Sequence, residues 1–210
     1  MEHEEEQLEK IREWWNKNGK AVIFGVIAAI VAAVSVQSWM ASEKVHIETA
    51  SAEYAQLLQY LETDKDKAIG VAERIVSDYE DTTYASLAAM LQARMATEKN
   101  DWNKASISLN WVMENADDDG LRHIARLRLS RVLLQQDKVD AALALLEGIE
   151  QGAFVADYEE LLGDIYLSKG DKDKARAAYA KALVVAAVSG NNRLLQMKLD
   201  DLAVESKETK

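Results

Sequence analysis

The sequence predicts an all-α protein: a single N-terminal transmembrane helix, then a solenoid of about four helix hairpins and a C-terminal capping helix. Three observations support this fold class. Residues 21–40 contain no charged residue. The whole chain lacks proline, which suits a nearly all-helical protein because helix interiors exclude proline. Beyond residue 45, apolar residues recur at three- and four-residue spacing between short polar turns.

The predicted transmembrane helix covers residues 21–40. A helix of this length rises about 30 Å, the thickness of the hydrocarbon core of a bilayer. The apolar stretch is longer than the core of a cleaved signal peptide, and no convincing small-residue cleavage site follows it. We therefore expect a permanent anchor.

Flanking basic residues predict the orientation of this anchor. Residues 1–20, before the anchor, contain four basic side chains: Lys10, Arg12, Lys17 and Lys20. The twenty residues after it contain a single lysine or arginine, Lys44. Because basic loops stay in the cytoplasm, residues 1–20 are predicted to form a cytoplasmic tail, and a domain of residues 45–205 is predicted to be translocated.

Tryptophans mark both ends of the predicted span: Trp14, Trp15 and Trp39. Tryptophan prefers the membrane interface, so an aromatic belt is the favoured interpretation. Docking of Trp14 and Trp15 on a partner is the alternative.

One side of the anchor carries a stripe of small residues. Gly25, Ala29 and Ala33 follow each other at four-residue steps, which allows close approach of another membrane helix. The alternative is an alanine-rich anchor that faces lipid, because alanine is common in membrane spans.

Composition narrows the function of the remaining chain. Outside residues 1–20 there are 21 basic and 30 acidic residues, a net charge of −9. This charge argues against nucleic acid as a partner, because phosphate binding needs a basic face. The chain has no cysteine, so disulfide and thiol chemistry are excluded.

Residues 159–183 resemble a tetratricopeptide repeat, the 34-residue helix–turn–helix unit. Leu162 and Gly163 match the close-packing pair of the first helix, and Gly170-Asp171 matches the turn. Small residues are needed where the two helices cross, because a larger side chain would push them apart. These positions are Gly163, Ala175 and Ala182.

An alanine after each turn extends this register along the chain. Ala68, Ala105, Ala142 and Ala175 are separated by 37, 37 and 33 residues. The agreement of position and residue type favours repeats over an irregular helical bundle. Residues 192–204 are expected to form the capping helix, with Leu194, Leu195, Leu199 and Leu202 on its apolar side.

No catalytic or metal-binding constellation is visible, and no cofactor is predicted. The three histidines are far apart in sequence, and no glycine-rich phosphate loop is present. Residues 115–120 hint at a calcium loop, but Arg126 stands where a bidentate glutamate is needed, so a solvated turn is favoured. An enzyme with dispersed carboxylates remains a distant alternative.

The first helices of successive repeats are expected to line a concave groove that accepts an extended peptide or a helix of a partner. The candidate groove residues make one end apolar and basic and the other end acidic: Leu87, Met90, Arg94, Ile124, Leu127, Arg131, Leu134 and Asp164. Alternatively, Arg131 and Asp164 pair across neighbouring repeats and only stabilise their stacking.

Taken together, the chain resembles the YfgM-like ancillary subunits of the bacterial Sec translocon. The resemblance covers nearly the whole chain and includes residues 18–21, 126–132, 140–143, 167–172 and 197–202. It implies a single-pass inner-membrane protein with a periplasmic tetratricopeptide-like domain. It further implies association with SecYEG and with a membrane-anchored periplasmic chaperone of the prolyl-isomerase type, and assistance to nascent secreted proteins.

Fold does not determine the partner, so a rival hypothesis stays open. The same architecture could be a scaffold of another envelope complex, in cell-wall synthesis or division. Both hypotheses describe a non-enzymatic interaction module.

Overall fold

The computed structural model describes residues 2–187 and 193–208 and divides into two units, residues 1–49 and residues 50–210. The predicted all-α class is confirmed: the described residues contain helices and no strand. Helix α1 (Glu2–Thr63) runs through the first unit and ends within the second. In the first unit, α1 is long and apolar enough to cross a membrane.

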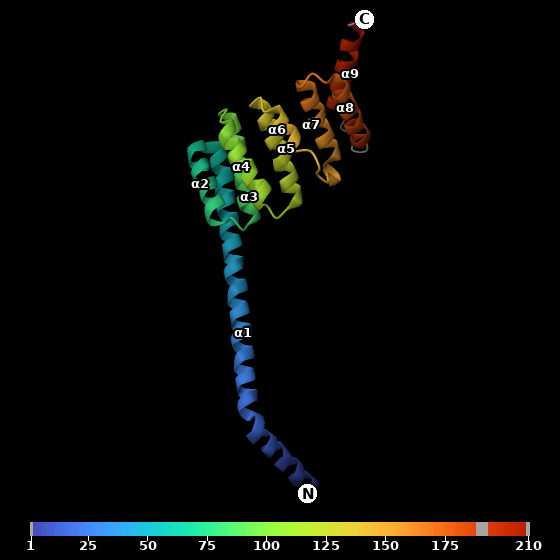
Figure 1. Ribbon diagram of the computed structural model, residues 1–210. Helices are drawn as coiled ribbons and strands as arrows, with labels where there is room; N and C mark the ends of the chain where they lie inside the picture. The colour runs from blue at the N-terminus through green and yellow to red at the C-terminus, as the bar shows by residue number, and fades with distance from the viewer. Residues whose placement is uncertain (1, 188–192, 209–210) are drawn as a thin grey trace. The chain divides into compact units, whose positions relative to one another are not determined.

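The second unit continues with short helices that follow one another in chain order (Figure 1). They are α2 (Lys65–Asp78), α3 (Thr83–Glu98), α4 (Trp102–Asn115), α5 (Asp119–Gln135), α6 (Val139–Ala144), the 3-10 helix η1 (Gly152–Phe154), α7 (Val155–Ser168), α8 (Lys172–Ala186) and α9 (Arg193–Glu208). Residue 192, where the capping helix was expected to begin, lies outside the described residues.

Three of the helix–helix turns have the same backbone geometry. The second residue after the first helix adopts a positive φ: 56° at Asn100, 60° at Asp137 and 78° at Gly170. The next N–H then donates back to a carbonyl five residues earlier, as from Asp101 to Ala96 at 2.9 Å. This Schellman arrangement satisfies the last carbonyls of the first helix and reverses the chain.

An aspartate starts the second helix of three hairpins. Asp64, Asp101 and Asp171 each accept a hydrogen bond from the backbone N–H three residues later. Such caps stabilise a helix by about 1 kcal/mol. Lys138 occupies the corresponding position of α6 and caps nothing. Helix α6 is only six residues long, shorter than α2, α4 and α8, and positive-φ glycines at 148 and 152 follow it.

The repeated alanine lies four residues after each of these four helix-start positions. Ala68, Ala105, Ala142 and Ala175 all have 0% exposed surface. At Ala142 the packing is supported by a buried hydrogen bond of 2.9 Å from the hydroxyl of Ser130 to the Ala142 carbonyl. The alanine register therefore marks the points where paired helices touch.

The core is a row of clusters, each shared by neighbouring hairpins. Leu57 of α1 packs with residues of α2 and α3, and the next clusters join α3 to α5, α5 to α7 and α8 to α9. This sequential packing is that of a solenoid. The cap α9 buries Leu195 and Leu202, but Leu194 is 61% exposed, so its expected place on the apolar side was wrong.

Candidate functional site: an arginine-lined groove

A cavity of about 400 Å³ opens between α3, α4 and α5. We call it the arginine groove, and its lining residues are Met90, Ala93, Arg94, Thr97, Trp102, Leu109, Arg128, Arg131, Val132 and Gln135. The floor is apolar because Ala93, Leu109 and Val132 are at most 5% exposed. The rim is basic because all three of its arginines are exposed.

Helical spacing brings these side chains together. Arg128 and Arg131 are one turn apart on α5, and Met90 and Arg94 are one turn apart on α3. The guanidinium of Arg128 lies 3.9 Å from the sulfur of Met90, so the two helices meet across the groove.

The three arginines differ in their partners. Arg94 donates to Glu98 at 3.1 Å, and the same carboxylate accepts from Lys65 at 2.7 Å. The bond from Lys65, followed by that from Arg94, holds the pKa of Glu98 below its usual value. Arg128 and Arg131 form no ion pair with any side chain that the structure describes. Their positive charge is therefore available to a ligand.

Only part of the predicted groove set meets in this cavity. Met90, Arg94 and Arg131 line it. Leu127 is 4% exposed and belongs to the core between α5 and α7, and Leu134 packs against the same core. The remaining two α3 and α5 candidates, Leu87 and Ile124, are partly buried outside the cavity.

The face of α5 that lines the groove is therefore rotated by one residue from the predicted face. The sequence-based prediction missed three residues that line the groove: Arg128 and Gln135 of α5, and Trp102 of α4. Arginine and glutamine at i and i+7, on the side of α5 opposite its buried leucines, were the available signal.

The carboxylates at the acidic end of the predicted groove are paired with other side chains of the protein. Asp164 and Glu160 both accept hydrogen bonds from Lys198 of α9, at 2.7 and 2.8 Å. Asp164 also accepts from the hydroxyl of Tyr179 at 2.7 Å. The alternative pairing of Arg131 with Asp164 was therefore wrong, because this carboxylate pairs with Lys198 and Tyr179 instead.

Burial shapes the protonation of this cluster. Burial, reinforced by the hydrogen bond to Asp164, raises the pKa of the Tyr179 hydroxyl, so this group remains a donor. Desolvation alone would lower the pKa of Lys198, but its bonds to Asp164 and Glu160 outweigh that effect and raise it. We call Lys198, Glu160, Asp164 and Tyr179 the α9 clamp.

The candidate packing face of the span is open in this structure. Gly25, Ala29 and Ala33 are exposed, and a Cβ placed at Gly25 would meet nothing within 4 Å. A second membrane helix could approach here, and the face remains a prediction.

Known proteins show the same architecture. Residues 12–204 match the family model of the tetratricopeptide repeat-like domain. MamA, from residue 41 to its end, of Desulfovibrio magneticus RS-1 shares the fold with a TM-score of 0.53 at 14% identity, over 76% of this chain and 96% of that one. The chain is a tetratricopeptide repeat-like protein that carries an N-terminal candidate membrane span.

Curated relatives define the family more closely. Proteins named "Ancillary SecYEG translocon subunit" from Escherichia coli K12 and Haemophilus influenzae Rd are 30% and 31% identical to this chain. The matches cover 97% and 95% of this chain and 98% and 97% of the relatives. The relative from Aggregatibacter actinomycetemcomitans is 32% identical over 95% of this chain and 97% of its own. The chain belongs to the YfgM-like family of ancillary SecYEG translocon subunits.

Proposed function

We propose that this protein is a non-enzymatic, membrane-tethered subunit that associates with the Sec translocon and links it to a periplasmic chaperone. One observation supports the Sec association: relatives named for SecYEG match this chain over nearly their whole length. The linked chaperone is proposed to be a membrane-anchored prolyl isomerase, and together they assist secreted proteins as they emerge.

Two surfaces support a linking role. The stripe of Gly25, Ala29 and Ala33 suits contact with a neighbouring membrane helix. The arginine groove suits an extended or helical segment that combines acidic and apolar side chains. Two weak contacts on one tethered chain reinforce each other, because the first raises the effective concentration of the second.

The proposed topology places residues 1–20 in the cytoplasm and the repeat domain in the periplasm. Four basic residues precede the span and one follows it closely. Protease added to spheroplasts should digest the repeat domain and leave the N-terminal tail intact, as detected by epitopes at each end. A protected repeat domain would contradict this orientation and the proposed periplasmic partner.

The Sec contact can be tested by enlarging the small stripe. We expect full-length protein in mild detergent to co-purify with SecYEG. Replacing Gly25, Ala29 and Ala33 together by leucine should reduce the recovered SecYEG several-fold, because close helix approach is lost. The matched control replaces Ile27 and Val31 by leucine, on another side of the same helix, and should retain the complex.

Two results would contradict the proposal in different ways. Full recovery of SecYEG by the three-leucine variant would exclude the stripe as the contact. Recovery of cell-wall or division proteins by the unmodified chain, without any translocon subunit, would instead favour the rival scaffold function.

A further inference from the structure

The N-terminal tail has an apolar face that the Sec role does not use. Leu8, Ile11, Trp14 and Trp15 are 64%, 65%, 54% and 49% exposed. At 100° per residue these four side chains share one side of α1. The charged side chains of residues 7–20 lie on the other side: Glu9, Lys10, Arg12, Glu13, Lys17 and Lys20. Residues 7–18 therefore form an amphipathic helical segment.

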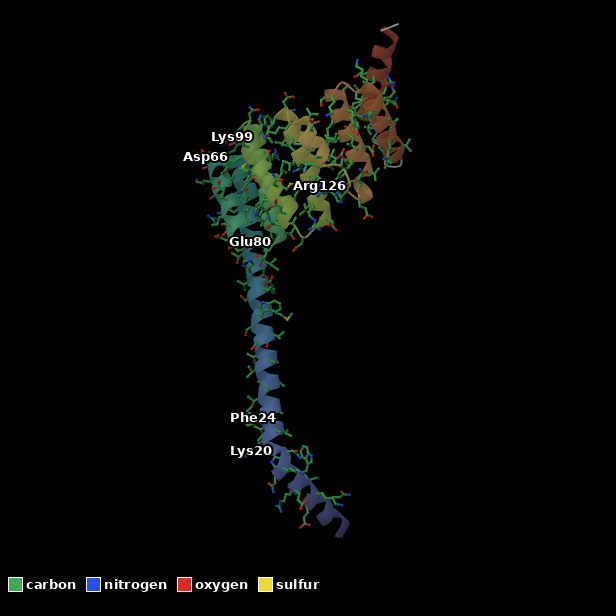
Figure 2. The ribbon with its side chains drawn as sticks, viewed as in Figure 1. Lys20, Phe24, Asp66, Glu80, Lys99 and Arg126 are labelled. Carbon is green, nitrogen blue, oxygen red and sulfur yellow. The ribbon has the colours of Figure 1, made fainter. Side chains whose placement is uncertain are left out.

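A bend separates this segment from the span. The side-chain amide of Asn18 donates to the carbonyl of Trp14 at 3.2 Å. In a regular α-helix this carbonyl accepts from the backbone N–H of Asn18, so the side chain competes with the helical hydrogen bond. Gly19 follows, and the Trp15 ring lies 3.2 Å from the place where a Cβ of Gly19 would stand. Figure 2 shows α1 changing direction close to Lys20. The segment thus leaves the axis of the span.

The geometry points to an interfacial helix. We propose that residues 7–18 lie along the surface of the bilayer that holds the span, with Leu8, Ile11, Trp14 and Trp15 inserted among the lipid headgroups. The apolar face ends only a few residues before the span begins, so the span holds this face at the membrane surface. Amphipathic helices with tryptophan on the apolar side are stable in this position.

Charge attraction does not explain this placement. Residues 1–20 contain four basic and six acidic residues, so electrostatic attraction between the tail as a whole and anionic lipid is weak. Insertion of the apolar face is the contact proposed here, and it should occur on zwitterionic lipid as well.

The absence of cysteine allows a direct test in the full chain. Four variants each receive one cysteine, at position 8 or 11 on the apolar face, or at position 9 or 13 as matched controls. Each cysteine carries a spin label, and the labelled protein is placed in phosphatidylcholine vesicles. Collision with oxygen reports lipid, and collision with a water-soluble nickel chelate reports water. We expect labels at 8 and 11 to favour oxygen several-fold over labels at 9 and 13.

Further variants test whether the apolar face causes the insertion, and added SecYEG tests whether a protein covers this face instead. With the label at position 11, Leu8→Glu together with Trp14→Glu should abolish the preference for oxygen, whereas Glu9→Gln together with Glu13→Gln should preserve it. Equal exposure of all four labels to the nickel chelate would overturn the proposal. So would labels at 8 and 11 that become shielded only after SecYEG is added, because a protein would then be the occupant.

Discussion

Replacing Gly163 by alanine is expected to destabilise the repeat domain by about 1–3 kcal/mol, although alanine is the better helix former. A Cβ at this position would overlap the ring of Tyr179, a contact between α7 and α8. That ring cannot turn away easily, because it is 1% exposed and its hydroxyl donates to Asp164. Thermal or urea unfolding of the protein, followed by circular dichroism, measures the difference.

Gly70 supplies the matched control for this experiment. It also lies inside a helix, α2, but a Cβ there would meet nothing within 4 Å. Gly70→Ala should therefore stabilise the protein by about 0.5–1 kcal/mol. If both substitutions stabilised the protein equally, the close contact of α7 with α8 would be contradicted.

Reversing two charges at the arginine groove is expected to weaken capture of the proposed periplasmic chaperone. Arg128→Glu together with Arg131→Glu should cost about 2 kcal/mol, roughly a thirtyfold loss of affinity, because each exposed ion pair contributes up to about 1 kcal/mol and like charges repel. Both arginines lie at the rim of the cavity, so the fold should tolerate the changes. Binding of the purified full-length proteins in detergent, measured at low and high salt, gives the loss.

Arg126 provides the control for this variant. It lies on the same helix (Figure 2) but does not line the cavity. Helix geometry places it about 200° around α5 from Arg128. Arg126→Glu reverses the charge of one arginine instead of two and should leave the affinity nearly unchanged. An equal loss in both variants would indicate a general electrostatic effect, and no loss in the double variant would place the chaperone elsewhere.

The repeat architecture was predictable because small residues at helix crossings leave a periodic signal. Ala68, Ala105, Ala142 and Ala175 mark the crossings, and aspartates four residues earlier cap three of the helices. The short α6 was not predicted: its start lacks a capping side chain, and the alanine spacing alone does not report where a helix ends.

The groove was harder to predict than the fold. Its residues come from three helices, and a rotation of one residue about α5 exchanges the core-facing Leu127 for the groove-facing Arg128. The α9 clamp was equally hidden, because Lys198 is 34 residues from Asp164 in sequence. Distant contacts of this kind leave no periodic pattern in a single sequence.

The α9 clamp has a consequence for the choice of protein fragments. Removing α9 would release Glu160 and Asp164 from Lys198 and leave two uncompensated carboxylates on α7. A fragment that ends before residue 193 would present an acidic patch whose charge Lys198 partly compensates in the intact protein. Such a fragment would attract basic peptides and yield spurious ligands in a binding screen, so the authentic specificity of this domain belongs to the chain that retains its last helix.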